Sequence, residues 1–468
     1  MIVALVTVPM VIHGLGKDRY GLLGIIWLVI GYFSLFDMGI GRALTKLVAE
    51  NLGLGKREEL PKIIWTAFWM ILAMGVVGAV IGILASQPLI YHLLNVPPEL
   101  RREGVISFIM ASVSIPVVIL SAAFIGVLEA HQKFSVITMV RIPLGVMTYL
   151  APVISLLFTT NLVAAVGVLI FTRVIAMAIY FQCVMRVSQD LLRPVKWTRK
   201  YVMELFGFGG WITVSNTISP LMTYMDRLFI GGSLNLTAVT YYATPYAMLG
   251  NLQIIPQSIQ GVLFPTLTTV AKSDPERLPL LYDRSTHIMF LLMLLPTSFS
   301  FLFAPELLQL WLGTEFRIAG TLPMQILSLG WTLSVIGNAP FTVLQSTGRP
   351  DLTAKIHLCT LPLYVLFLLV FTKHFGIVGT ACTWALRHFF QTLVLNAFLK
   401  KIIPSLGKSA IRGILLCLGT VVYFAGLWLV NSLLLKGLLF AGLAFYELHY
   451  FFYRTNILRP SLGKAAEI

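Results

Sequence analysis

Charged residues are scarce in this chain. Only 11% of its 468 residues are Asp, Glu, Lys or Arg, whereas 57% are hydrophobic and the mean hydropathy is +0.87. A soluble globular domain carries about 25% charged residues, so this composition excludes a soluble protein. The sequence therefore predicts an all-α integral membrane protein, because helices satisfy their own backbone hydrogen bonds in lipid.

Cysteines and enzymatic motifs are also sparse. The four cysteines lie in apolar segments and form no CxxC pair, so nothing indicates a disulfide framework or a metal site. The sequence contains no GxSxG, HExxH or Walker motif, and its loops are too short for an ATPase domain. We therefore expect a protein that is not an enzyme and that uses no cofactor or metal.

Long apolar runs dominate the sequence instead. About 20 helical residues span the roughly 30 Å hydrocarbon core of a bilayer, and most of these runs reach that length. We predict about fourteen transmembrane helices, near residues 1–12, 20–36, 63–85, 105–128, 135–158, 163–185, 207–230, 239–264, 286–304, 321–345, 356–372, 376–398, 411–430 and 435–452.

The first apolar run is short. Residues 1–12 supply about 18 Å of helix against the roughly 30 Å that a crossing needs. The run also lacks the charged region and cleavage site of a signal peptide. We expect a truncated first helix, with a hydrophobic extension encoded upstream of Met1.

Positive charge is unevenly distributed along the chain, which has a net charge of +15. If the N-terminus is cytoplasmic and every predicted helix crosses once, cytoplasmic loops and tail hold 24 Lys and Arg, and the opposite side holds 8. This is the bias of the positive-inside rule, and it predicts that both termini are cytoplasmic. It also explains the basic composition without a nucleic-acid partner.

A weak internal repeat divides the chain. A shift of 222 residues places Tyr20 on Tyr242 and Val48 on Val270, and both copies then enter a charged loop. Six predicted helices separate the copies, so the repeats have the same orientation in the membrane. We predict two six-helix lobes, at residues 1–200 and 201–404, with a central cavity between them. Residues 405–468 are predicted to form two extra helices and a cytoplasmic tail.

Five short motifs follow one another along nearly the whole chain: YGLLG at 20–24, FSLFDMGIG at 33–41, Asp226-Arg227, STGRP at 346–350 and FGIVGTA at 375–381. In order and spacing they resemble Wzx-type oligosaccharide flippases, polysaccharide transporters of the MATE-like MOP exporter superfamily. The resemblance implies movement of a polyprenyl-pyrophosphate-linked oligosaccharide from the cytoplasmic to the periplasmic leaflet of a bacterial inner membrane. The product would be a surface polysaccharide such as O-antigen or exopolysaccharide, with a polymerase and chain-length machinery as partners.

Two arginines lie in the middle of predicted helices. Arg173 and Arg387 each cost about 2.5–3.5 kcal/mol at the bilayer centre on insertion scales, which favours a cavity-facing position. A structural pair with a carboxylate or backbone carbonyls is the alternative. Given the resemblance, these residues and His388 are candidates for binding the pyrophosphate of the substrate.

The predicted helix over 239–264 carries a polar face, formed by Tyr246, Gln253, Gln257 and Gln260. Spacings of seven, four and three residues place these side chains on one side of a helix. Amides donate and accept hydrogen bonds, which suits the hydroxyls of a sugar. Interhelical hydrogen bonding within the lobe is the alternative.

Charges near the predicted membrane surfaces supply further candidates. Asp37 is an N-cap or part of a gate, and Asp226 with Arg227, near the predicted outer face, forms a gate or a lobe-to-lobe brace. Arg42 and Lys46 are candidates for pyrophosphate capture at the cytoplasmic mouth, as is the rim around Arg141, although the positive-inside rule alone explains such charges. An apolar stripe is expected opposite Arg42 and Lys46, at Ala43, Leu44, Leu47, Val48 and Leu52.

Two other functions stay open on the sequence. A cation-coupled small-molecule or multidrug exporter of the MATE type would need a buried carboxylate, whereas the acidic residues are predicted at the membrane edges and the deepest charges are arginines. A membrane-embedded glycosyltransferase or polymerase would need a large outer loop with catalytic side chains, and the sequence has no such loop.

Overall fold

The computed structural model is all-helical over the residues it describes, which are 2–33, 40–187, 197–207, 210–274, 276–347, 349–430 and 432–462. All fourteen predicted segments overlap helices in this part of the chain, which confirms the all-α class; the count of fourteen crossings stays a prediction. Eight described helices are long and apolar enough to cross a membrane, at Arg57–Leu93, Pro98–Ala130, Phe134–Leu156, Leu162–Val187, Leu278–Leu302, Thr314–Ser346, Asp351–Ile402 and Pro404–Trp428.

The chain forms two compact units, and the first comprises Met1–Ala243 and Pro350–Thr380. Unit 1 therefore contains the N-terminal half and the first part of the long helix α16 (Pro350–Ile402). Its other helices are α1 (Ile2–Leu15), α2 (Lys17–Phe33), α3 (Ile40–Gly53), the 3₁₀ turn η1 (Arg57–Glu59), α4 (Leu60–Pro88), the π turn η2 (Leu89–Leu93), α5 (Pro98–Val113), α6 (Ile115–Ala130), α7 (Phe134–Leu156), α8 (Leu162–Val187), α9 (Arg199–Gly207), α10 (Gly210–Ser233) and the start of α11 (Leu236–Gly250).

Unit 2 comprises Thr244–Arg349 and Ala381–Ile468. The two units divide the chain at residues other than those proposed for the repeat lobes, so the lobe boundaries stay a prediction. Besides the rest of α11 and α16, unit 2 contains the 3₁₀ turn η4 (Asn251–Gln253), α12 (Ile254–Ser273), α13 (Leu278–Leu302), α14 (Ala304–Leu312), α15 (Thr314–Ser346), the 3₁₀ turn η5 (Pro404–Leu406), α17 (Gly407–Trp428) and α18 (Leu433–Leu462).

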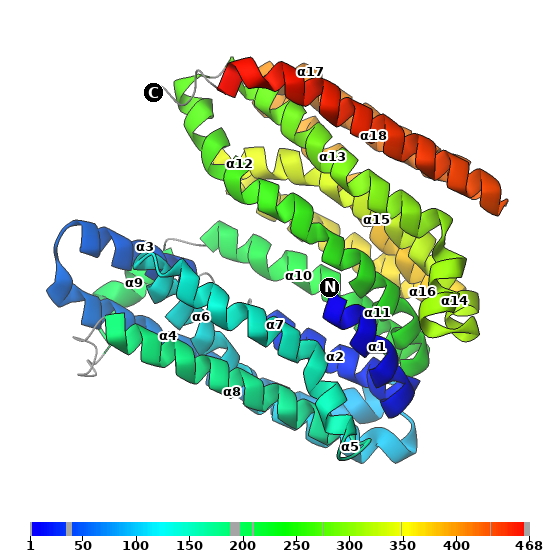
Figure 1. The fold of residues 1–468 in the computed structure, drawn as a ribbon. Coiled ribbons are helices and arrows are strands. Elements are labelled where there is room, and N and C mark those ends of the chain that lie inside the picture. The colour runs from blue at the N-terminus through cyan, green and yellow to red at the C-terminus, as the bar shows by residue number, and fades with distance from the viewer. Residues whose placement is uncertain are drawn as a thin grey trace. The chain divides into compact units, whose positions relative to one another are not determined.

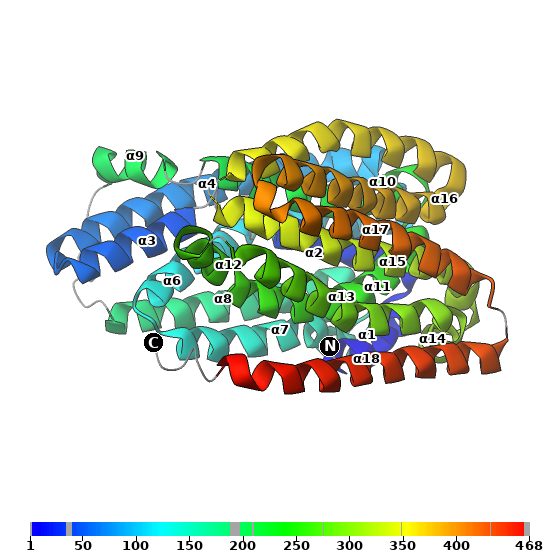
Figure 2. The same cartoon turned by 90° about the horizontal axis from the view of Figure 1, so that it is seen from above.

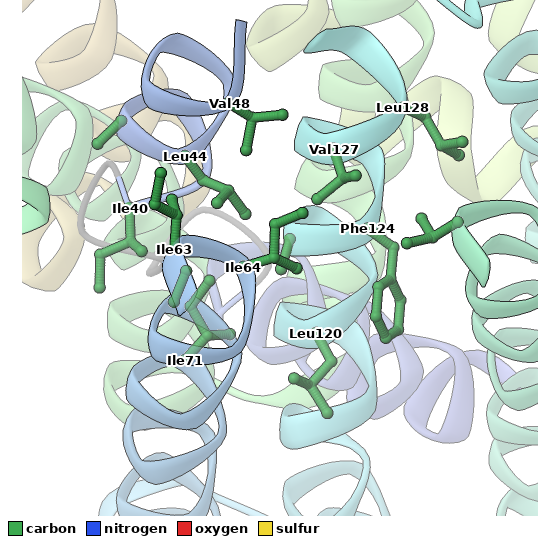
Figure 3. Close-up of a cluster of buried hydrophobic side chains, with 14 of the residues drawn as sticks. Ile40, Leu44, Val48, Ile63, Ile64, Ile71, Leu120, Phe124, Val127 and Leu128 are labelled. Atoms are coloured by element: carbon green, nitrogen blue, oxygen red, sulfur yellow. The ribbon is translucent and has the colours of Figure 1, made fainter. Parts of the chain in front are cut away.

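The core of unit 1 lies where α3, α4, α6 and α8 meet (Figures 1 and 3). The short helix α3 buries one side against α4 and α6, and its other side carries Lys46 and Glu50. The predicted apolar stripe is confirmed, since its members are buried or packed against this core: Ala43, Leu44, Leu47, Val48 and Leu52.

Small residues let helices of unit 1 approach closely, as is usual between helices in membranes. A Cβ atom on Gly75 of α4 would lie 2.8 Å from the Cα of Pro116 in α6. A Cβ atom on Gly82 would lie 2.4 Å from the Oγ of Ser112 in α5. Larger residues at either glycine would therefore separate α4 from its neighbours.

Unit 2 is built around α13 and α15, which pack along their lengths. Helix α18 runs beside α13 in both views (Figures 1 and 2), and Phe440 of α18 packs on Phe299 with ring centroids 5.2 Å apart. Phe301 of α13 meets Phe424 of α17 at 5.1 Å. The two C-terminal helices are therefore part of the packed body of unit 2.

Three helix breaks refine the expected segments. The helix predicted over 105–128 lies within the apolar span Pro98–Ala130, which has a turn at Ser114 between α5 and α6. The helix predicted over 239–264 contains a 3₁₀ turn, η4, where α11 meets α12. The predicted boundary between 356–372 and 376–398 falls at Gly376, whose φ of 61° interrupts α16. Glycine adopts this left-handed conformation without the steric cost that other residues meet.

Candidate substrate-binding site

A stripe of polar and aromatic side chains follows the second part of α16 in unit 2. Trp384, Arg387, His388 and Gln391 recur every three or four residues, which places them on one side of the helix. Trp384 is 1% exposed and Arg387 is 5% exposed. The sequence singled out Arg387 and His388 but missed Trp384 and Gln391, which the same spacing would have revealed.

Four rings from three helices form an aromatic cluster around Trp384. The Trp384 ring centroid lies 4.7 Å from that of Trp331 in α15, 5.5 Å from that of Tyr246 in α11 and 4.5 Å from that of His388. Tyr246 and Trp331 lie 5.4 Å apart. We call Tyr246, Trp331, Trp384 and His388 the unit 2 aromatic cluster.

Glycines on the neighbouring helices make room for this cluster. A Cβ atom on Gly330 would lie 2.5 Å from Cζ3 of Trp384, and one on Gly250 would lie 3.3 Å from Cζ2 of Trp331. The close approach of α15 to α16 therefore depends on the absence of a side chain at Gly330. Trp384 thus lies in the interior of unit 2, beside the half-buried Trp331.

Several buried polar atoms of unit 2, two of them in the cluster, have no hydrogen-bond partner among the described residues. They are the indole Nε1 atoms of Trp331 and Trp384, the amide Nε2 of Gln253 and the amide Oε1 of Gln391. An unsatisfied buried donor costs about 1–3 kcal/mol, so each such atom in a native structure calls for an explanation. The indole and amide N–H groups donate, and they match hydroxyl, ether or phosphate oxygens of a ligand.

A second polar group of unit 2, by contrast, is internally satisfied. The hydroxyl of Tyr282 donates to Oδ1 of Asn396 at 3.0 Å, and the hydroxyls of Thr297 and Thr332 lie 2.8 Å apart. The hydroxyl of Thr392 donates to the carbonyl of Leu333 at 3.2 Å. These bonds join α13, α15 and α16, so this polar group has a structural role.

The predicted polar face of 239–264 is divided by the helix break at η4. Tyr246 on α11 and Gln253 in η4 are buried, Gln260 on α12 is half-buried and Gln257 is exposed. These side chains do not all lie on one side, because the 3₁₀ turn changes the rotation per residue between Tyr246 and the later glutamines. The structure therefore places Tyr246 in the aromatic cluster, and the cavity role of Gln253, Gln257 and Gln260 stays a prediction.

Arg173 lies in unit 1, half-buried in the middle of α8. Among the described residues Arg173 makes no ion pair. A structural pair with one of the described carboxylates is therefore excluded. Arg387 belongs to unit 2. A common cavity lined by both arginines stays a prediction.

The candidates for the cytoplasmic mouth have different outcomes. The side chain of Arg42 lies outside the described residues, as does Asp37, the candidate for an N-cap or gate. Lys46 on α3 is exposed, with Nζ 3.6 Å from a carboxylate oxygen of Glu50. Arg141 is exposed on α7. Pyrophosphate capture by Lys46 and Arg141 stays a prediction.

Asp226 links two helices of unit 1. Its carboxylate is 0% exposed and accepts a hydrogen bond from the hydroxyl of Tyr242 at 2.7 Å, which joins α10 to α11. The backbone N–H of Arg227 donates to the same carboxylate at 2.7 Å. A gate or lobe-to-lobe brace at this pair stays a prediction.

Two acidic side chains are buried inside the protein. Asp226 is fully buried, and Glu447 of α18 is 4% exposed. Oε1 of Glu447 has no hydrogen-bond partner among the described residues. Burial inside the protein does not give depth in the membrane, so the expected position of the acidic residues at the membrane edges stays a prediction.

Comparison with known proteins identifies the family. A family described as polysaccharide biosynthesis proteins matches residues 15–319, which is more than half of the chain. The chain belongs to this family.

Two relatives have names that specify transport. A putative O-antigen transporter of Shigella flexneri is 27% identical over 398 residues, which covers 84% of this chain and 93% of the relative. A probable low-salt glycan biosynthesis flippase of Haloferax volcanii is 24% identical over 273 residues, with 57% and 56% of the two chains covered.

Solved structures of similar fold are transporters of the MOP superfamily. An inward-facing multidrug resistance MATE family transporter has a TM-score of 0.75 at 14% identity, with 92% of this chain and 96% of that chain covered. A MOP superfamily transporter from Pyrococcus furiosus, reported with reversed polarity of its binding pocket, has a TM-score of 0.59 at 15% identity, with 91% and 92% covered. These similarities show that the chain has the MATE-like fold.

Proposed function

We propose that this protein flips a polyprenyl-pyrophosphate-linked oligosaccharide from the cytoplasmic to the outer leaflet of a bacterial inner membrane, for surface polysaccharide synthesis. Membership of the polysaccharide biosynthesis family, the names of the two relatives and the MATE-like fold support this function. Multi-pass insertion with both termini cytoplasmic agrees with the charge bias. A polysaccharide polymerase and chain-length machinery are the partners that would use the product.

The observation that carries the proposal is the unit 2 aromatic cluster with its unsatisfied donors. Aromatic rings offer apolar faces to the C–H groups of a sugar, and the N–H groups of Trp331, Trp384 and Gln253 match its oxygens. Arg387 stands next to His388 in the same stripe and supplies a cation for an anionic substrate group. Sugar and anion recognition together fit a lipid-linked oligosaccharide better than a cationic drug.

A vesicle assay tests this function directly. The full-length protein is reconstituted in liposomes with a fluorescent polyprenyl-pyrophosphate oligosaccharide, and an impermeant quencher reports the fraction of label in the outer leaflet. We expect the protein to make the inner-leaflet label accessible, while protein-free vesicles keep it protected. Equal protection in both kinds of vesicle contradicts the proposal.

A cation-coupled small-molecule exporter is the second candidate. It is favoured by the two buried carboxylates, Asp226 and Glu447, since coupling to a cation requires such a group. Deletion of the gene separates the candidates. If the protein is a flippase, the deletion strain should lose surface polysaccharide and keep its drug susceptibility. If it is an exporter, the strain should keep its surface polysaccharide and become more susceptible to drugs.

A further inference from the structure

The turn that joins α10 to α11 is held against the start of α2 within unit 1. The hydroxyl of Thr237 donates to the carboxylate of Asp18 at 2.5 Å, and the hydroxyl of Thr240 donates to the backbone carbonyl of Lys17 at 2.7 Å. The ammonium group of Lys17 lies 5.7 Å from the ring centroid of Tyr241. Side chains of the first turns of α11 therefore bind the first turn of α2.

Asn95, in the turn between η2 and α5, binds the other side of the α10–α11 turn. Its backbone N–H donates to the carbonyl of Gly231 at 2.9 Å. Its side-chain amide donates to the carbonyls of Gly232 and Leu234, each at 2.9 Å. The last carbonyls of a helix have no partner within it, so Asn95 supplies partners that α10 itself lacks.

Glycines bring the backbones of these segments close together. A Cβ atom on Gly21 of α2 would overlap the carbonyl oxygen of Leu236 at the start of α11. A Cβ atom on Gly231 would lie 3.3 Å from Cδ1 of Ile25, a side chain of α2 that is 0% exposed. No further side chain therefore fits between α2 and the α10–α11 turn.

The start of α2 is itself anchored to α5 and α8. Nε of Arg19 donates to both carboxylate oxygens of Glu103 in α5, at 3.0 and 3.1 Å, and the backbone N–H of Leu162 in α8 donates to the same carboxylate. Hydrogen bonds between charged partners are roughly twice as strong as neutral ones. Helices α2, α5 and α8 therefore form one platform, to which the α10–α11 turn is bound through hydroxyl and amide groups.

The contact joins segments of the two predicted lobes, although both sides of it lie in unit 1. The internal repeat assigns α2 and Asn95 to the lobe at 1–200 and the α10–α11 turn to the lobe at 201–404. With a cytoplasmic N-terminus, the start of α2, the end of the helix predicted over 63–85 and the end of the helix predicted over 207–230 all face outward. The predicted lobes therefore meet at the outer face.

We propose that the contacts of Lys17, Asp18 and Asn95 with the α10–α11 turn form an outer latch, which closes the outer side of the protein and opens in each transport cycle. A substrate that leaves toward the outer leaflet passes between the predicted lobes, and the close approach at Gly21 and Gly231 leaves no space there. The latch consists of polar bonds at a membrane surface, where water replaces them when they break, so it can open at low cost. The inference rests on the proposed function for the identity of the cargo.

Cysteine labelling tests the latch without a substrate. Ile25→Cys, in a protein whose four native cysteines are replaced by serine, places a thiol beneath the latch, and a membrane-impermeant maleimide is added outside spheroplasts. Thr237→Val together with Thr240→Val should raise the labelling rate at least about fivefold, because two hydrogen bonds of the closed state are lost. Thr148→Val, whose hydroxyl donates to the carbonyl of Leu144 in its own helix, is the matched control and should leave the rate unchanged. Equal rates in all three proteins overturn the proposal.

A disulfide tests whether the latch has to open. Asp18→Cys with Thr237→Cys, in the same cysteine-free protein, is oxidised in the vesicles of the flipping assay. We expect oxidation to slow flipping at least about tenfold and reduction to restore it. Thr297→Cys with Thr332→Cys is the matched control, because these hydroxyls lie 2.8 Å apart between α13 and α15 of unit 2, and its oxidation should not slow flipping. Undiminished flipping by the oxidised latch pair, or failure of the pair to form a disulfide, overturns the proposal.

The two assays separate the latch from the proposed function. If the wild-type protein flips the fluorescent substrate and the oxidised latch pair flips it equally fast, the latch is wrong and the function stands. If the wild-type protein does not flip the substrate, the function is wrong, and the labelling rates still decide whether the latch exists.

Discussion

The hydroxyl of Tyr242 donates a hydrogen bond to the buried carboxylate of Asp226 at 2.7 Å, so that α10 and α11 are joined inside unit 1. The loop that follows α10 is held to the same unit, because the side-chain amide of Asn95 donates to the carbonyls of Gly232 and Leu234, each at 2.9 Å. Together these contacts fix the end of α10 and the start of α11 in unit 1.

Tyr242→Phe should destabilise unit 1. The change keeps the ring but removes the donor to a buried carboxylate, and hydrogen bonds to charged groups contribute about 1.5–3 kcal/mol. We expect a lower Tm in thermal unfolding of the purified protein. Tyr91→Phe, at a tyrosine that is 46% exposed, is the matched control and should leave the Tm unchanged. Equal Tm values for both variants would contradict the role of the bond.

Trp384→Phe should reduce polysaccharide export. The change keeps an aromatic ring and removes the indole N–H, so one hydrogen bond to substrate is lost and transport should fall by about two- to tenfold. Trp428→Phe, at a tryptophan that is 61% exposed on α17, should have no effect. Surface polysaccharide is measured in cells with equal amounts of each variant in the membrane. Normal export by Trp384→Phe argues against a donor role for this indole.

Arg387→Ala and Arg173→Ala should each block export while the protein stays in the membrane. Removal of a cation that binds the pyrophosphate should cost at least about tenfold in transport. Arg→Lys should restore part of the activity, because the charge remains but the planar fork of donors is lost. If the alanine variants disappear from the membrane, the arginines have a structural role. Normal export by both variants contradicts a role in binding.

A reporter fused after Ile468 should be active only in the cytoplasm. The basis is the distribution of 24 Lys and Arg on one side against 8 on the other. A phosphatase fusion at the same position serves as the matched control and should be inactive. Periplasmic activity at this terminus would require an odd number of crossings and would overturn the predicted count.

Composition and periodicity were sufficient for the helical membrane fold and for amphipathic elements such as α3. Insertion cost and spacing likewise pointed to Arg387 and His388, because charge in an apolar run is visible in the sequence itself. Trp331 was missed because it meets Trp384 through packing between distant segments, and an aromatic residue in an apolar run carries no local signal. The 3₁₀ turn η4 was missed although Gly250 precedes it and Pro256 follows it, because both residues are common within membrane helices.

The interruption of unit 1 has a consequence for the synthesis of the chain. Unit 1 includes Pro350–Thr380, so it lacks its last helix until residues 244–349 have left the ribosome. Packing surfaces that this helix covers, such as Met222 of α10 against Tyr364 and Leu368, must wait in the bilayer during that interval. Biogenesis of the N-terminal half is therefore completed only after most of the C-terminal half has been translated. A nascent chain arrested before Pro350 would hold an unfinished unit 1, in which Met222 lacks its packing partners Tyr364 and Leu368.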